Sequence, residues 1–527
     1  MVYLLMFLSG AAAALPLLFP KLFFLSWFAV APLIAVMIRR IERGMTRRGA
    51  YFMGFTWFGG YFFSIYHWFC YLYPMKFLGL SPVMAVLTIA VCWVGLTALQ
   101  TFQMGFVTLG FRLVCRRRWT APLLFAFCWM IGEWAQTKTW MGVPWARLSL
   151  SQTSFLPNIQ SASLFGSITL SGVIVLCNGL IALAALAVIE KKRRIRALPL
   201  ALAALMIVAV NSGYGAIRLN SLNHAPKGEP VRVALIQGNI STDDKWAPGM
   251  TEQSLELYLQ MTRYAYEDYQ PDLILWPETV IPTKILNSKA MTGAVRSCAR
   301  ELGCVIVVGA FTGVENEKEG DIDTYNSLIT FNADGSISEE IYSKRRLVPF
   351  GEFLPMEDFF RTFLPVLADL GNLGGNLTAG RYPNIISTDV GSLGALICFD
   401  SIYETLTLDS VRDGAQLLLL STNDSWYRDS AAVYQHNAHA KLRAVETGRW
   451  VARAANTGVS SIIMPSGEVT GELEPLVTGN VYGEVYLSDE VTPYVMIGNV
   501  GVYLAFVGCA IAYFSEKLAA AIKKSIE

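Results

Sequence analysis

Three polar residues that could form a catalytic set each follow an apolar, β-rich run in the second half of the chain. Glu278 ends the stretch DLILWPE, Lys344 lies in YSKRRLVPFGE, and Cys398 ends GALIC. The ends of buried strands are where sheet scaffolds place reactive groups. A cysteine there can act as a nucleophile, a carboxylate can take its proton, and an ammonium can stabilise an oxyanion. The residue types therefore fit nucleophilic catalysis by Cys398.

Neighbouring groups and simpler structural roles bear on this hypothesis. The backbone N–H of Phe399, directly after the cysteine, could be a second oxyanion donor. Because the Lys344 ammonium would favour the thiolate, we expect the Cys398 thiol to be unusually acidic. Each residue also has a structural explanation: a packed cysteine at a strand end, a solvated acid in a Pro-Glu turn, or a lysine in a surface cluster with Arg345 and Arg346. The residue types alone leave these alternatives open.

The spacing of histidines and cysteines bears on metal binding and on disulfides. His436 and His439 are three residues apart on a predicted helix and could be half of a metal site, but no third ligand is evident and we predict no metal. Six of the nine cysteines lie in or beside apolar runs. The sequence contains no CxxC and no Cys/His spacing that suits zinc, so the cysteines do not indicate a disulfide framework.

Alternating β-rich and amphipathic stretches surround the three candidate residues. We predict helices at 251–269, 291–303 and 433–447, a hairpin of 327–331 with 338–342, and strands at 231–237, 272–276, 304–309, 394–398, 417–421, 450–454 and 460–464. Most of these strands are apolar without alternation. That pattern is typical of sheets buried beneath helices, which is an α/β domain.

Composition divides the chain into two regions. It has 527 residues, 53% hydrophobic, with a mean hydropathy of +0.41, which is typical of a membrane protein with a sizeable soluble part. Residues 218–495 hold 21 Lys and Arg against 36 Asp and Glu, whereas the rest of the chain holds 21 Lys and Arg against five acidic residues. An acidic soluble domain argues against nucleic acid as a partner.

Apolar runs of membrane-spanning length indicate about eight transmembrane helices. They lie at 2–19, 22–38, 49–72, 78–111, 120–135, 164–189, 197–217 and 495–514. Basic clusters follow the second, fourth, sixth and eighth runs, and basic loops stay in the cytoplasm. We therefore predict a membrane domain of seven spans at 1–217, an extracytoplasmic domain at 218–494, and an eighth span with a cytoplasmic tail at 495–527.

One acidic residue and several aromatic residues in or beside the apolar runs have predicted roles of their own. Glu133 lies in an apolar run near its end, so a functional role and a snorkelling structural role both stay open. We expect an aromatic belt at the membrane interface, formed by Trp57, Tyr61, Tyr66, Trp68, Tyr71 and Tyr73. Trp140 and Trp145 could instead shape an entrance for lipid.

In this order, the motifs around the three candidates resemble the nitrilase superfamily, and the whole chain resembles its membrane branch, the apolipoprotein N-acyltransferases. The resemblance rests on LILWPET, YSKRRLVPFGE and ALICFD, and on QGNI, VPFGEFLP, STNDSW and GVPWARLSLSQ at 142–152. It implies an αββα sandwich with Glu278 as general base, Lys344 as oxyanion lysine and Cys398 as nucleophile. Motif positions further imply oxyanion or substrate-binding roles for Phe399, Glu352, Asp400, Trp246 and Asn326.

The resemblance also implies a reaction, its partners and a location. Cys398 would take an acyl chain from a phospholipid, with phosphatidylethanolamine as the expected donor, and pass it to the α-amino group of a diacylglyceryl-cysteine at the N-terminus of an apolipoprotein. Neither metal nor cofactor is implied. The setting would be the bacterial cytoplasmic (inner) membrane, with the catalytic domain on the periplasmic side. Phe399-Asp400 stands where the family has Tyr-Glu, which leaves substrate binding and the acceptor amine open.

Two other functions remain compatible with the sequence. A membrane-tethered amidase with water as acceptor would use the same three residues. A transporter or lipid-binding scaffold with a degenerate domain is the other alternative, but all three catalytic positions are filled and the apolar runs carry few charges.

Overall fold

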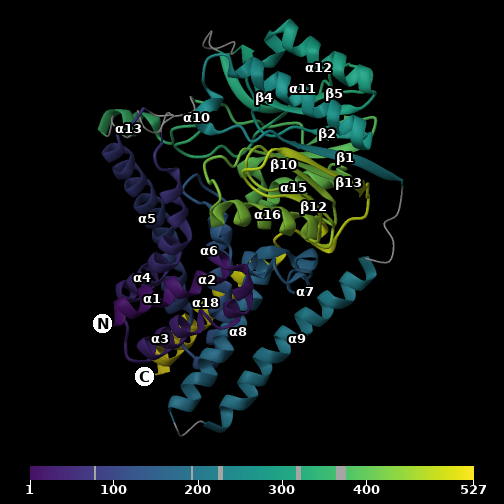
Figure 1. Cartoon of the computed structure of the whole chain (residues 1–527). Coiled ribbons are helices and arrows are strands. Elements are labelled where there is room, and N and C mark those ends of the chain that lie inside the picture. Colours follow the sequence, from purple (N-terminus) through teal and green to yellow (C-terminus); the bar gives the residue numbers. More distant parts are fainter. Residues whose placement is uncertain (76–78, 191–193, 223–228, 316–321, 364–375, 527) are drawn as a thin grey trace. The chain divides into compact units, whose positions relative to one another are not determined.

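The computed structural model describes residues 1–526 except 76–78, 191–193, 223–228, 316–321 and 364–375. Lys191, Lys192 and Arg193, which carry part of the orientation argument, lie outside these residues. The chain forms two compact units (Figure 1). The first contains Met1–Phe69, Thr88–Ser221 and Met496–Glu527, and the second contains Cys70–Leu87 and Leu222–Val495. The segment Cys70–Leu87, which the sequence analysis placed in the membrane domain, therefore belongs to the second unit.

The first unit is helical. Its main helices are α1 (Val2–Ala13), α2 (Leu15–Leu18), α3 (Ala31–Glu42), α4 (Arg47–Ile65), α5 (Pro82–Val114), α6 (Ala121–Ala135), α7 (Leu156–Ile159), α8 (Ala162–Ile189), α9 (Ala197–Leu222) and α18 (Val500–Ile526). Four helical segments among the described residues are long and apolar enough to cross a membrane: Pro20–Glu42, Pro82–Val114, Ala162–Ile189 and Ala197–Leu222. Val2–Leu18 and Val500–Ser515 are shorter apolar helices. The chain is a multi-pass membrane protein, and the count of eight spans stays a prediction.

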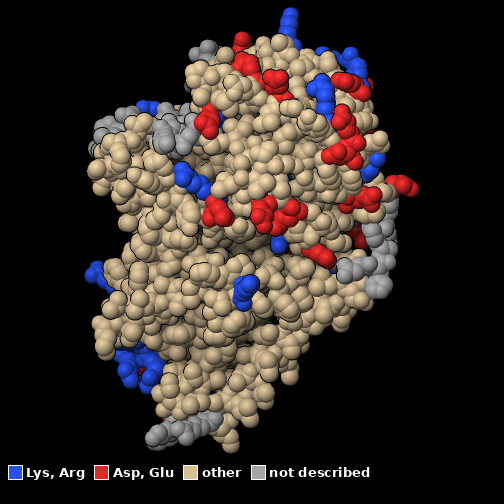
Figure 2. All heavy atoms as spheres, viewed as in Figure 1, with Lys and Arg blue, Asp and Glu red and all other residues tan. Residues whose placement is uncertain are grey.

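The surfaces of the two units differ as the sequence division indicates. On α9, large apolar side chains are exposed along the helix, at Leu198, Leu202, Leu205, Met206 and Val210, which suits contact with lipid tails. In Figure 2, acidic side chains gather on the surface of the second unit, whereas uncharged residues cover most of the visible surface of the first.

The predicted aromatic belt is wrong for four of its six members. Trp57, Tyr61, Tyr66 and Trp68 are buried, and only Tyr71 and Tyr73 are exposed. For Trp57 and Tyr61 the reason is the close contact of α4 with α1: a Cβ atom on Gly60 would lie 1.9 Å from the Phe7 carbonyl oxygen. The absence of side chains at such points brings the two helices together and buries the face of α4 that carries Trp57 and Tyr61, whose rings stack at 5.6 Å.

Glu133 has a structural role, but it does not snorkel. The side chain is buried, and its Oε1 atom accepts hydrogen bonds from Trp129 Nε1 at 2.9 Å and from the Leu148 backbone N–H at 3.0 Å. Arg147 Nε lies 3.8 Å from its other oxygen. A buried acid inside an apolar bundle needs such partners.

Two mixed sheets form the second unit. The strand order in one is β13 (Gly479–Tyr486), β1 (Pro230–Gln237), β2 (Leu273–Leu275), β4 (Val305–Glu315), β5 (Ile322–Phe331) and β6 (Tyr342–Ser343), with β3 (Ile281–Lys284) also paired to β4. In the other it is β12 (Val469–Leu473), β11 (Ser460–Ile463), β10 (Val451–Ala455), β9 (Leu417–Thr422), β8 (Gly391–Ile397) and β7 (Ile385–Thr388). The central strands of both sheets, β1-β2-β4 and β8-β9-β10, run parallel.

Helices cover the outer face of each sheet, so the unit has four layers. Helices α11 (Met250–Tyr269) and α12 (Lys289–Leu302) pack on the first sheet, and α15 (Glu404–Arg412) and α16 (Ala431–Thr447) on the second (Figure 1). Along β1, Val233 and Leu235 enter the core between the sheets, whereas Ala234 and Ile236 pack under the helices. Burial of both strand faces explains the unalternating apolar runs, and it confirms the predicted αββα sandwich.

Candidate active site

Cys398 lies at a strained turn at the end of β8. Its backbone has φ +49°, in the left-handed region, at the start of a short 3-10 helix, Cys398–Ile402. A non-glycine residue there costs about 1–3 kcal/mol and persists only where its surroundings hold it, which is common at active sites. The thiol is buried near the Thr422 hydroxyl at the end of β9. The fold thus fixes the position of this sulfur.

Asp400 holds this turn to the segment that carries Lys344. Its fully buried carboxylate accepts hydrogen bonds from the Tyr342 hydroxyl at 2.9 Å and from the backbone N–H groups of Arg345, Arg346 and Ile397 at 3.2, 2.7 and 3.2 Å. Burial raises the pKa of Asp400 to about 6. Because protein groups already occupy both oxygens, Asp400 holds the Cys398 turn to the Lys344 segment, and its expected role at the oxyanion or the substrate stays a prediction.

Lys344 and Glu278 form a buried ion pair. Lys344 Nζ donates to Glu278 Oε1 at 2.9 Å and to Glu352 Oε1 at 2.8 Å. Burial lowers the pKa of Lys344, but the two carboxylates outweigh it and hold that pKa well above its usual range. Burial likewise raises the pKa of Glu278, yet the neighbouring ammonium leaves it below the ordinary value. At neutral pH the lysine is therefore a cation and Glu278 a carboxylate.

The remaining contacts of Glu278 and Glu352 orient them. Asn326 Nδ2 donates to Glu278 Oε1 at 2.7 Å, and the Asn423 backbone N–H donates to Glu278 Oε2 at 2.8 Å. Glu352 Oε2 accepts from the Val348 backbone N–H at 2.8 Å. Asn326 thus contacts Glu278, and Glu352 contacts Lys344, whereas the roles expected for Asn326 and Glu352 at the oxyanion or the substrate stay predictions.

The expectation of an acidic Cys398 thiol is wrong for the resting protein. Burial raises its pKa first, and the Glu278 carboxylate raises it further, whereas Lys344 lowers it by less. The Lys344 ammonium alone would lower this pKa, but the Glu278 carboxylate neutralises it. Cys398 therefore rests as a thiol near an ionised Glu278.

Lys245 is a further charged group at this site; it lies in the Lys245-Trp246 stretch that resembles the family pattern, but no role was predicted for it. Its side chain is only 6% exposed, and its Nζ donates to the hydroxyl of Thr279, the residue after Glu278. Burial lowers the pKa of Lys245 to about 8, and its charge interacts with Glu278, Lys344 and Cys398. With Lys245 counted, two ammonium groups balance two carboxylates. The resemblance of Lys245-Trp246 to the family pattern does not by itself predict that this ammonium is buried beside Glu278.

A buried charged network lies behind Cys398. His436 Nδ1 and Arg453 Nη2 bind the two oxygens of Asp424 at 2.8 and 2.6 Å, and His436 Nε2 lies 3.1 Å from the Cys398 carbonyl oxygen. One ligand atom from each of Cys398, Asp424 and His436 lies within 4.8 Å of the others, so these three residues have the spacing of a metal site. His439, the partner that the sequence suggested for His436, is not one of them. Because a guanidinium already neutralises Asp424, this set is better suited to bracing the turn than to holding a cation.

The contacts that the structure gives Trp246 and Phe399 are mainly with other aromatic rings. Trp246 is exposed, its ring stacks on Phe311 at 6.4 Å, and Lys245 Nζ lies 5.7 Å from it. Phe399 is buried edge-on to Tyr403 at 5.5 Å. Their roles toward oxyanion and substrate stay predictions.

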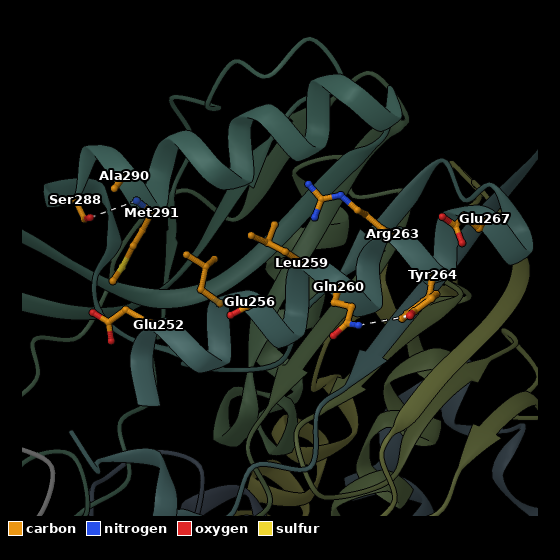
Figure 3. Close-up of a pocket in the computed structure, with 11 residues that line it drawn as sticks. Glu252, Glu256, Leu259, Gln260, Arg263, Tyr264, Glu267, Ser288, Ala290 and Met291 are labelled. Carbon is orange, nitrogen blue, oxygen red and sulfur yellow. Dashed lines mark hydrogen bonds between the residues drawn. The ribbon is translucent and has the colours of Figure 1, made fainter. Parts of the chain in front are cut away.

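A separate groove lies on the helices that cover the first sheet. It has a volume of about 810 Å³ and runs along α11 and the start of α12, lined by residues such as Glu252, Glu256, Leu259, Arg263 and Met291 (Figure 3). Among the described residues, its lining includes no cysteine, and Cys398, Lys344 and Glu278 are not part of it.

Comparisons with known proteins match both regions of the chain. Residues 232–491 match the carbon-nitrogen hydrolase family, and residues 9–180 match the N-terminal domain of apolipoprotein N-acyltransferase. The chain is 30% identical over 516 residues to apolipoprotein N-acyltransferase of Geobacter metallireducens, covering 97% of this chain and 94% of the relative. The same protein of Methylococcus capsulatus is 31% identical over 397 residues, covering 74% and 73%. That of Gloeobacter violaceus is 31% identical over 490 residues, covering 90% and 86%.

Proposed function

This chain belongs to the apolipoprotein N-acyltransferase family, and we propose that Cys398, Lys344 and Glu278 carry out its acyl transfer. The donor is a phospholipid, with phosphatidylethanolamine as the expected one, and the acceptor is the α-amino group of the N-terminal diacylglyceryl-cysteine of an apolipoprotein. The single observation that carries this assignment is the buried Lys344–Glu278 ion pair, whose two charges both act on the thiol of the strained Cys398.

The first half-reaction transfers the acyl chain to the enzyme. Cys398 Sγ bonds to the ester carbonyl carbon while its proton passes to Glu278, and the Lys344 ammonium stabilises the oxyanion. The ester C–O bond then breaks, the leaving alkoxide takes the proton from Glu278, and a lysophospholipid departs. A thiol resting beside a carboxylate suits this order, since thiolate charge develops only as the carbonyl is attacked.

The second half-reaction releases the acyl chain to an amine. The α-amino nitrogen attacks the thioester, Glu278 takes its surplus proton, and the C–S bond breaks to return the proton to Cys398. An α-amino group has a pKa near 7.7–8.0, so about half of it is the neutral nucleophile at mildly alkaline pH. Burial of the sulfur supports acyl transfer over hydrolysis, because a thioester held away from bulk water survives until an amine arrives.

We place the catalytic unit on the periplasmic side of the inner membrane, because the basic clusters assign the alternate loops to the cytoplasm. A reporter fused near residue 350 tests this: it should be active only if it requires export. Activity of a strictly cytoplasmic reporter at that position would exclude the orientation.

The acceptor separates the proposed transferase from a membrane-tethered amidase. Wild-type protein charged with acyl chain should transfer it to a synthetic diacylglyceryl-cysteine peptide much faster than to water. The matched control peptide carries an acetylated α-amine. Acyl-enzyme that decays at the same rate with either peptide would support the hydrolase instead.

A further inference from the structure

A small pocket of about 160 Å³ lies in the second unit, separate from the α11–α12 groove. Its lining includes the polar residues Thr242, Ser425, Thr457 and Arg428 and the apolar side chains of Leu72 and Trp426. A lining that combines a cation and hydroxyls with carbon surface suits an anionic group attached to an aliphatic one.

Thr457 supplies the first independent sign of a ligand. This residue is only 2% exposed, and its hydroxyl has no hydrogen-bond partner among the residues that the structure describes. Leaving a buried hydroxyl unsatisfied costs about 1–3 kcal/mol, so native proteins rarely do so without a reason. An acceptor oxygen from a ligand in the pocket would satisfy it.

Arg428 supplies the charge. Its backbone has φ +47°, an unusual conformation for arginine that fixes the direction in which the side chain leaves the loop. The side chain is exposed and forms no ion pair within the described part of the chain, and the adjacent Asp429 accepts a hydrogen bond from the Tyr434 hydroxyl at 3.0 Å. A guanidinium without a carboxylate partner is well matched to phosphate oxygens.

The pocket and the catalytic base share one loop. The Asn423 backbone N–H binds Glu278 Oε2 at 2.8 Å, and the loop continues directly into Ser425 and Arg428. Two residues of extended chain reach at most about 7 Å, so Ser425 lies close to the base. In a glycerophospholipid, only the glycerol carbons separate the phosphate from the ester carbonyls. A lipid whose phosphate occupied the pocket would therefore have an ester within reach of the site.

We propose that this pocket binds the phosphodiester of the phospholipid donor, with Arg428 and Thr457 contacting its oxygens and Leu72 and Trp426 its glycerol carbons. The proposal rests on the proposed function, which requires a phospholipid donor. It assigns donor selection to residues outside the catalytic set.

The test compares acyl-enzyme formation from two donors, a phospholipid and an uncharged diacylglycerol, in detergent micelles. For Arg428→Gln and Thr457→Val, the phospholipid concentration at half-maximal rate should rise about tenfold or more, as expected for loss of a charge-assisted or buried hydrogen bond. Half-saturation by diacylglycerol should stay unchanged. Arg263→Gln, which removes an arginine paired with Glu301 on α11, is the matched control and should behave as wild type with both donors.

Inorganic phosphate distinguishes the source of the anion. It should inhibit wild type competitively with phospholipid and lose this effect in Arg428→Gln. Phosphate inhibition that depends on Arg428, with unchanged half-saturation by phospholipid, would show a free-phosphate site and overturn the proposal. Unchanged phospholipid kinetics in both variants, with the adduct still on Cys398, would overturn the pocket assignment alone. Failure of wild type to form an adduct from either donor would overturn the proposed function as well.

Discussion

Replacement of Lys344 by methionine should impair both stability and catalysis, because this ammonium neutralises two buried carboxylates. Its hydrogen bonds to Glu278 and Glu352 are 2.9 and 2.8 Å long. Removing one partner of a buried ion pair typically costs about 3–5 kcal/mol, since the remaining charge is left uncompensated. Loss of one oxyanion donor adds about 3–4 kcal/mol to the barrier, which slows acyl-enzyme formation by about 10²–10³-fold.

The stability cost of Lys344→Met should depend on pH in a direction that the charges fix. In wild type, the lowered pKa of Glu278 contributes stability that is present at neutral pH and lost as pH falls through that pKa. In the variant, the two carboxylates lose the ammonium that binds both and keep only the Lys245 charge nearby, so one pKa rises above its unfolded value and acid stabilises the fold. The difference between the two proteins should therefore be largest near neutral pH and shrink toward acid pH.

Denaturant unfolding of detergent-solubilised protein at about pH 7.5 and about pH 5, with acyl-enzyme formation measured in parallel, checks both effects. Lys289→Met, at the exposed start of α12, is the control for removing a lysine. Equal free energies of unfolding for wild type and Lys344→Met at neutral pH, or a difference that grows toward acid pH, would refute the ion-pair reasoning.

Three further substitutions test the other charged groups of the site. Glu278→Gln should slow adduct formation by about 10²–10⁴-fold because no base takes the thiol proton; a wild-type rate in rapid-quench experiments would remove Glu278 from this role. In wild type, adduct formation should decline as pH rises through about 8, where Lys245 loses its charge; Lys245→Met should be slower near neutral pH and lack that decline, and an unchanged pH profile would contradict it. Asp400→Asn presents an amide donor to backbone N–H groups, so it should lower the free energy of unfolding by about 1–3 kcal/mol and also slow adduct formation; loss of activity with unchanged stability would instead support a substrate contact.

Much of the fold around the site follows from local pattern. The strand at 272–276 contains β2, and the strand at 394–398 overlaps β8, so the sequence placed Glu278 and Cys398 correctly at strand ends. The hairpin before Lys344 is also confirmed, although its second strand shortens to Tyr342–Ser343. Short edge strands such as β3 and β7 were missed because they carry no long apolar run.

What the sequence could not supply depends on groups brought together from distant segments. The role of Asp400 depends on N–H groups 54 and 55 residues away, and the hydrogen bond from Lys245 to Thr279 joins residues 34 apart. The Cys398 pKa is a balance of burial, Glu278 and Lys344, and its sign follows only from their arrangement. The burial of Trp57 similarly depends on which helix face α1 covers.

The central claim is that Cys398 carries the acyl chain as a thioester. Wild-type protein incubated with phospholipid in the absence of an amine acceptor should gain one acyl mass, mapped by peptide mass spectrometry to Cys398 and released by hydroxylamine. Cys298 and Cys304 should stay unlabelled, because burial raises the pKa of both thiols and no described base or ammonium of the catalytic set contacts them. A hydroxylamine-labile adduct on Cys398 that is absent from Cys398→Ala is the predicted result, and an adduct that persists in Cys398→Ala or maps to Cys298 or Cys304 would contradict it.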